Sequence, residues 1–114
     1  MAAVAKRDVL ARIDSDLQHG HVHPALQRLA SLVAAYPEDL DVRARRAALN
    51  RRIGNVVEAG RWGFLTEEVT DAEVRAFERA EPRAWARLSA LRLPHDPTGD
   101  LGERATRRYA DLLH

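Results

Sequence analysis

Three histidines alternate along a short stretch, and imidazole is the side chain in this sequence best suited to bind a metal ion. His19, His21 and His23 lie within the string Gln-His-Gly-His-Val-His-Pro. Imidazoles at this spacing can share one ion only if the segment is extended and a further ligand, such as Asp16 or Glu58, comes from elsewhere. No second pair of ligands accompanies them. We therefore expect solvated histidines at the tip of a turn, with no bound metal or other cofactor.

Arginine provides the second candidate chemistry, because a guanidinium can donate paired hydrogen bonds to a carboxylate or a phosphate. Arginines are densest between Arg43 and Arg52, and Lys6 is the only lysine. Such a cluster most simply forms a solvated helix face, but two binding functions also fit it. One is recognition of an acidic peptide by Arg45 and Arg52. The other is non-specific contact with nucleic-acid phosphates.

The residues after this cluster argue against a sequence-specific DNA reader. A helix-turn-helix protein with its turn at Gly54 would place the recognition helix over 56–65, where Arg61 is the only basic residue. The whole chain carries 18 basic and 17 acidic residues, a net charge of +1, so it has no overall field that would attract nucleic acid. Nucleic-acid binding is therefore the second hypothesis.

Catalytic motifs are missing from the sequence. It contains no cysteine, no His-Glu-x-x-His string, no nucleophile elbow and no glycine-rich phosphate loop. We expect a protein that is not an enzyme. The start of the chain lacks the order of a signal peptide, and no apolar run approaches the roughly 18 residues of a membrane span. We expect a cytoplasmic protein, and the preference for arginine over lysine is typical of bacteria with a high-GC genome.

Apolar periodicity predicts an all-α chain of about seven helices with no strand. The predicted helices are 5–18, 24–35, 39–53 and 56–65, followed by helices that begin at Thr70, Pro82 and Asp100. Thr70 with Glu73, and Asp100 with Glu103, have the spacing of a capping box. Between the last two helices, residues 95–99 are predicted to form a loop. Most aromatic residues lie from Trp62 onward, so we expect them to form a core where the first four helices meet the rest.

Small residues recur at one interval in the first half of the chain. Gly54 follows Gly20, and Ala59 follows Ala25, in each case after 34 residues. This is the period of a helix-turn-helix repeat in which the glycine ends the first helix and the alanine packs in the second. The interval predicts two copies of one helical hairpin lying side by side.

The sequence resembles the tetratricopeptide repeat over about residues 6–65. In the first copy Ala25, Leu29, Leu32 and Pro37 match the family's positions, whereas Gly63 in the second copy stands where a large residue is usual. The length of 114 residues predicts a single domain over 1–114. The resemblance implies two antiparallel hairpins stacked as a right-handed superhelix over 5–65, and we expect the helices over 70–114 to cap them. The segment 59–65, Ala-Gly-Arg-Trp-Gly-Phe-Leu, also looks like part of a small uncharacterised family of high-GC bacteria.

These features predict a non-catalytic protein-interaction or regulatory module. Its binding surface would be the exposed side of the first and third helices, lined by Arg7, Arg45 and Arg52. The expected partner is a protein or an acidic peptide, and a second copy of the chain is a further candidate. The alternative is non-specific nucleic-acid binding through the Arg43–Arg52 region.

Overall fold

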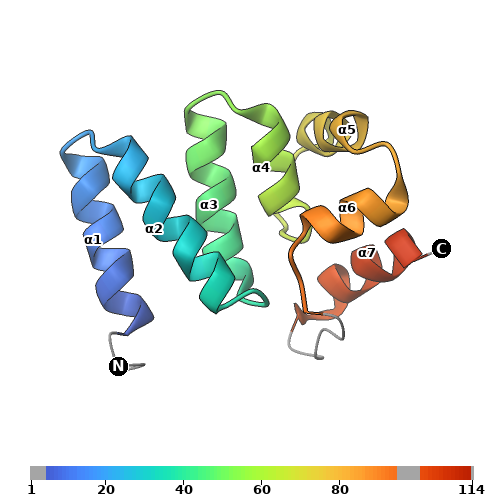
Figure 1. Ribbon diagram of the computed structural model, residues 1–114, viewed down its shortest axis with the longest axis horizontal. Coiled ribbons are helices and arrows are strands. Elements are labelled where there is room, and N and C mark those ends of the chain that lie inside the picture. Colours follow the sequence, from blue (N-terminus) through green and yellow to red (C-terminus); the bar gives the residue numbers. More distant parts are fainter. Residues whose placement is uncertain (1–4, 95–100, 114) are drawn as a thin grey trace.

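The computed structural model describes residues 5–94 and 101–113, and this part of the chain forms seven α-helices and no strand (Figure 1). The predicted all-α class, built from stacked antiparallel hairpins, is confirmed. None of these helices has the length and apolarity needed to cross a membrane. Asp100 and the predicted loop 95–99 lie outside the described residues. The helices are α1 (Lys6–Gln18), α2 (Val22–Ala35), α3 (Leu40–Arg52), α4 (Val56–Gly63), α5 (Asp71–Ala80), α6 (Ala84–Ala90) and α7 (Glu103–Leu113).

The turns after α1 and α3 are two copies of one structure. Gly20 and Gly54 both have a positive φ, +73° and +84°, which is the backbone region that glycine enters without steric cost. The amide of each glycine donates to the carbonyl three residues earlier, and the amide of the next residue donates to the carbonyl five residues before it. This pair of bonds is a Schellman motif. The 34-residue interval therefore marks equivalent turns, as the sequence predicted.

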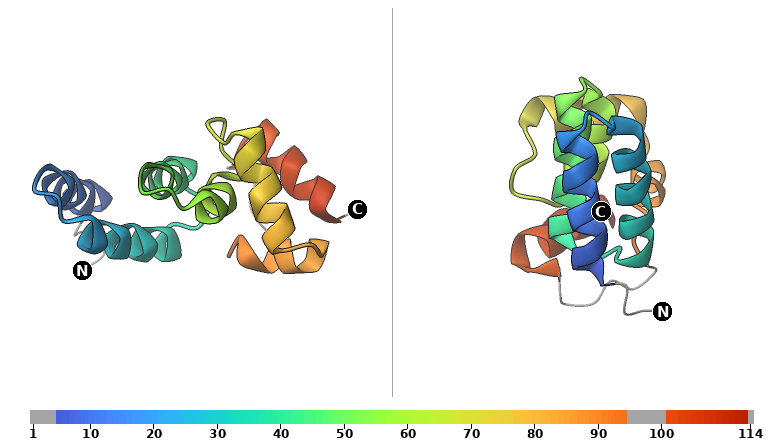
Figure 2. Two further views of the ribbon diagram at one scale, coloured as in Figure 1. Left: turned by 90° about the horizontal axis from the view of Figure 1, so that it is seen from above. Right: turned by 90° about the vertical axis from the view of Figure 1, so that its left-hand side faces the viewer.

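Ala25 and Ala59 are equivalent in burial as well, since both are fully inaccessible to solvent. α3 lies between α2 and α4 and contacts both (Figure 1). Seen from above, α1 and α3 lie toward one side of the stack, and α2 and α4 lie toward the other (Figure 2). The stack therefore has two distinct faces.

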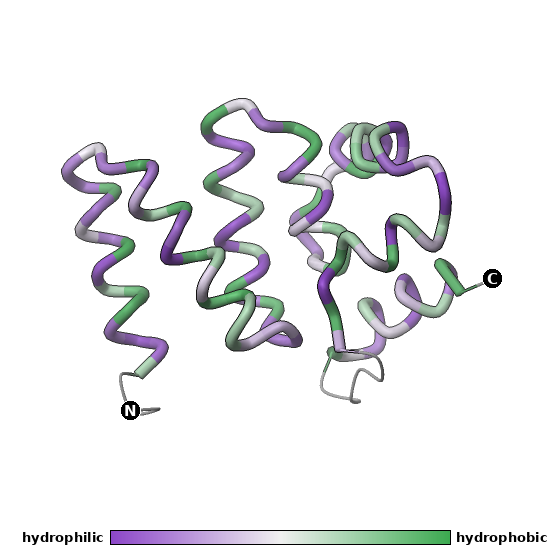
Figure 3. The backbone as a smooth tube through the Cα atoms, viewed as in Figure 1, coloured by the Kyte–Doolittle hydropathy of each residue, from purple (hydrophilic) through white to green (hydrophobic). Residues whose placement is uncertain are grey.

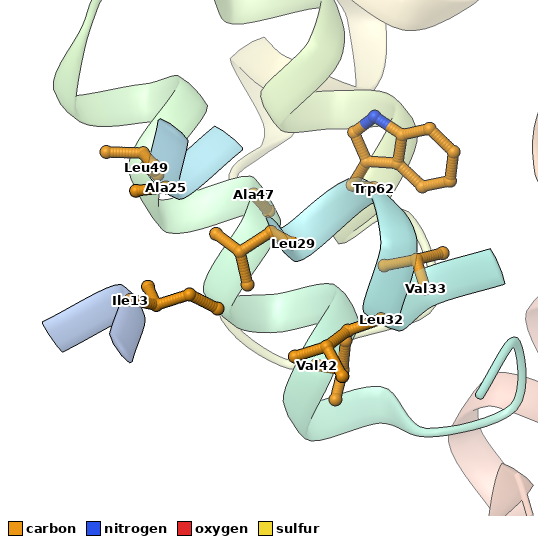
Figure 4. Packing of buried hydrophobic residues seen from close by; sticks show 9 residues of the cluster. All are labelled: Ile13, Ala25, Leu29, Leu32, Val33, Val42, Ala47, Leu49 and Trp62. Carbon is orange, nitrogen blue, oxygen red and sulfur yellow. The ribbon is translucent and has the colours of Figure 1, made fainter. Parts of the chain in front are cut away.

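Two clusters of buried residues hold the helices together. Hydrophilic and apolar residues interleave along each helix, so each helix has one side to bury (Figure 3). In the first cluster, Ile13 and Trp62 lie at opposite ends (Figure 4). It is made of Ile13, Ala25, Leu29, Leu32, Val33, Val42, Ala47, Leu49 and Trp62. The second is made of Phe64, Leu65, Phe77, Leu91, Leu101, Ala105 and Leu112.

Two residues differ from what the sequence predicts. Trp85 is 66% exposed, although the aromatic residues from Trp62 onward are expected to form a core. Leu88 and Leu91 follow Trp85 at intervals of three residues, which fall 60° short of a full turn, so Trp85 stands about 120° around α6 from the buried Leu91. Ile53 lies within the predicted helix 39–53, yet it follows the last residue of α3, belongs to the turn and is 45% exposed.

Candidate functional site

A groove of about 210 Å³ runs between α1 and α3 on one face of the stack. We call it the α1–α3 groove. Its base is apolar, and its charged residues come from both helices. It is lined by Ile13, Asp14, Leu17, Leu29, Arg45, Ala48, Leu49 and Arg52.

Helical spacing explains how α3 supplies half of this lining. Arg45, Ala48, Leu49 and Arg52 stand at i, i+3, i+4 and i+7, which places them on one side of a helix. Leu49 is buried and Ala48 is exposed, so the small alanine leaves a hollow between the two arginines. Arg45 and Arg52 lie two helical turns apart, separated by about 10.5 Å along the axis.

The structure brings together two of the three arginines that the sequence proposed as binding residues. Nε of Arg45 donates to Oδ2 of Asp41 at 3.2 Å, while Arg52 has no ion pair among the described residues. Arg7 does not line the groove. Its side chain is 89% exposed and lies 3.9 Å from Asp8. The groove therefore presents two arginines along α3 and one carboxylate, Asp14, on α1.

The other arginines of the Arg43–Arg52 region point away from this groove. Arg43 is fully buried, and Arg51 forms an ion pair with Glu73 on α5. The Arg46 guanidinium lies over the ring of Trp62, with its central carbon 3.6 Å from the ring centroid. One dense run of arginines is thus divided among four environments, because successive helical residues point in different directions.

A second hollow, of about 360 Å³, involves α2, α3, α4 and Arg92, which lies two residues beyond the end of α6. We call it the tryptophan pocket. Three arginines distant in the sequence meet there, Arg46, Arg61 and Arg92. Arg61 lies over the same ring as Arg46, 4.4 Å from its centroid. The remaining lining residues are Ala30, Val33, Ala34 and Trp62.

Arg43 and Arg61 hold the end of α6 beside this pocket. Nη2 of Arg43 donates to the carbonyl of Leu91, and Nε of Arg61 donates to the carbonyl of Ala90, both at 2.6 Å. Burial, with smaller effects from the charges of Arg46 and Arg61, lowers the pKa of Arg43 to about 10. Sequence reasoning missed this cluster because no helical or repeat spacing relates Arg61 to Arg92.

The histidines lie at the turn between α1 and α2. His19 and His21 stack with ring centroids 5.9 Å apart, and Nδ1 of His19 lies 2.7 Å from the carbonyl oxygen of Ser15. Asp16, considered as a further ligand, forms an ion pair with Arg28 at 2.8 Å. Within the described residues, no group of three or more His, Cys, Asp or Glu side chains is placed to hold a metal ion.

Comparison with known proteins gives a family and no activity. No curated protein matches the chain, and no solved structure matches it. The match to one family runs from residue 4 to residue 112 and so includes every helix but the last residue of α7. The chain belongs to the family of unknown function DUF6584.

Proposed function

We propose that this chain is a non-catalytic interaction module of tetratricopeptide type, whose α1–α3 groove binds an acidic segment of a cytoplasmic partner protein. The observation that carries the proposal is the placement of Arg45 and Arg52 at either end of an apolar hollow. A guanidinium forms charge-assisted hydrogen bonds with carboxylates, and an apolar hollow between two such groups fixes the register of the bound segment.

The geometry suggests what the segment looks like. Two carboxylates about 10 Å apart would match the spacing of Arg45 and Arg52 along α3. An apolar side chain between them would occupy the hollow of about 210 Å³ above Ala48. Asp14 repels carboxylates from the α1 side, so the acidic residues of the partner would face α3 and a neutral or basic residue would face α1.

Non-specific nucleic-acid binding is less well supported. A phosphate backbone needs several cations along one surface, but the five arginines of the Arg43–Arg52 region lie in separate environments. A single-stranded oligonucleotide titrated at low and moderate salt tests this alternative. Measurable affinity that falls steeply with salt would favour nucleic acid, and it would count against the peptide groove if acidic peptides did not bind.

The peptide hypothesis is tested with labelled peptides of about nine residues in which two glutamates flank a leucine. We expect saturable binding, a loss of roughly three- to tenfold in affinity for Arg45→Gln and for Arg52→Gln, and weaker binding when serine replaces the leucine. Arg12→Gln is the matched control, because it removes one exposed arginine of α1 that does not line the groove. Equal losses in all three variants would overturn the proposal, since they would show attraction by net charge alone.

A further inference from the structure

The tryptophan pocket gathers more positive charge than the fold neutralises. Arg46 lines it from α3, Arg61 from α4, and Arg92 from the segment that follows α6. Glu58 is the one carboxylate among the described residues that contacts any of these residues. It lies 3.6 Å from Arg61 and also accepts a hydrogen bond from Nε1 of Trp62. Three guanidinium groups thus share a single carboxylate.

Two of the arginines at this place lack the partners that a buried cation requires. Arg46 is half-buried against Trp62, and its guanidinium has no hydrogen bond or ion pair to any described residue. Arg43, whose guanidinium carbon lies 5.7 Å from the centroid of the Trp62 ring, is fully buried. Its guanidinium bonds only to carbonyl oxygens, and its buried Nη1 has no partner. Burial lowers the pKa of Arg46 to about 10, with the charge of Glu58 opposing this shift and the charge of Arg61 adding to it. A bound anion would stabilise both charges.

The backbone at Arg92 points to the same conclusion. Its φ is +55°, the left-handed region that glycine usually occupies directly after a helix. A residue with a Cβ enters this region at an energetic cost, and such strain is concentrated at functional sites. The hydrogen bonds from Arg43 and Arg61 to Leu91 and Ala90 hold the segment that carries Arg92. The Arg92 side chain lines the pocket.

We propose that the tryptophan pocket binds the phosphoryl group of a phosphorylated ligand, with Arg46, Arg61 and Arg92 as its donors. A phosphate monoester carries a charge of about −1.5 to −2 and three acceptor oxygens, so it matches three guanidiniums better than a single carboxylate does. Trp85 is 66% exposed and lines an adjoining hollow together with Arg61 and Arg92. It offers a surface on which the rest of the ligand can stack.

Fluorescence provides a direct test, because both tryptophans of the chain lie at these two hollows. In a Trp85→Phe variant, Trp62 is the only tryptophan and reports on the pocket. It is titrated with inorganic phosphate, adenosine 5′-monophosphate and O-phosphoserine at constant ionic strength, with adenosine and serine as the unphosphorylated controls. We expect a saturable change with at least one phosphorylated probe and none with its unphosphorylated control. The probe with the highest affinity indicates whether the natural ligand is free phosphate, a nucleotide or a phosphorylated peptide.

Variants assign the binding to the three arginines. In the Trp85→Phe background, we expect Arg46→Gln and Arg92→Gly each to weaken binding tenfold or more. Arg7→Gln removes the same charge from an exposed position of α1 that lines neither hollow, and it should leave the affinity unchanged. Arg92→Gly relieves the backbone strain, so we expect it to stay folded, and urea denaturation of the variant checks this. No saturable signal with any phosphorylated probe would overturn the proposal, and so would an equal loss in Arg7→Gln. Neither result bears on the peptide groove, which is tested with peptides and with other variants.

Discussion

Arg51 on α3 contacts both carboxylate oxygens of Glu73 on α5, at 2.5 Å and 2.8 Å. The same carboxylate accepts from the backbone amide of Thr70 at 3.0 Å, while Oγ1 of Thr70 accepts from the amide of Glu73. This is the predicted capping box at Thr70. One buried side chain therefore both begins α5 and ties it to α3, across the boundary between the two hairpins and the helices that follow.

Replacing this carboxylate tests the link. We expect Glu73→Gln to lower the free energy of unfolding at neutral pH by roughly 1 to 3 kcal/mol, less than for a fully buried pair because the Arg51 side chain is 35% exposed. Urea denaturation measures the change. Glu103→Gln is the control, since its ion pair with Arg107 is largely in water and should change stability by under about 0.5 kcal/mol.

The same pair predicts a pH dependence. The hydrogen bond from Arg51 holds the pKa of Glu73 below its ordinary value of 4.5. A carboxyl group with a lower pKa in the folded state stabilises the fold above its unfolded pKa, and the contribution disappears as pH falls through the folded pKa. Unfolding measured between about pH 7 and pH 3 should show a steeper loss below pH 4.5 in the wild type than in Glu73→Gln. Parallel curves would contradict this role.

A close approach of α4 to α5 explains a glycine within the segment 59–65. A Cβ added to Gly60 would lie 2.1 Å from the backbone carbonyl oxygen of Glu73, whereas one added to Gly63 would lie 3.2 Å from Cβ of Ala47. We expect Gly60→Ala to cost at least 1 to 3 kcal/mol, because backbone has to move, and Gly63→Ala to cost less. Thermal unfolding of both variants checks the order, and a neutral Gly60→Ala would mean that the crossing is wider.

Strain at Arg92 predicts a stabilising substitution. The left-handed conformation costs a residue with a Cβ about 1 to 2 kcal/mol in the folded state. Glycine avoids this cost, but it also makes the unfolded chain more flexible, which offsets part of the gain in stability. Arg92→Gly should therefore be as stable as the wild type or more stable by up to about 1 kcal/mol. Urea denaturation of the wild type and of Arg92→Gly measures the difference in the free energy of unfolding. A clear loss of stability would show that the arginine holds the fold together and is not retained for binding.

Local patterns in the sequence predicted the helices and turns well. Gly20 and Gly54 predict their turns because glycine adopts a positive φ without the steric cost that other residues have. The pairing of Arg45 with Arg52 followed from helical spacing, since residues seven apart share a side of a helix. Each of these inferences needs only neighbours along the chain.

Relationships between distant segments could not be predicted in this way. Arg61 is an isolated basic residue in the sequence, and the residues next to it in the chain do not predict its hydrogen bond to the carbonyl of Ala90. Arg43 belongs to an apparently solvated run, yet it is fully buried because its guanidinium reaches the carbonyls of Pro37 and Leu91. Arg7 is predicted to share a binding surface with Arg45 because both lie on exposed helix sides, but it lies outside the groove.

A charge exchange at Arg52 tests the central claim most directly. The affinities of the wild type and of Arg52→Glu are measured for the Glu-Leu-Glu peptide and for a version in which lysine replaces the glutamate that faces Arg52. We predict that Arg52→Glu loses affinity for the acidic peptide and regains it for the lysine peptide, since two like charges are replaced by an opposite pair. If the variant binds both peptides as the wild type does, the α1–α3 groove is not where the acidic segment binds.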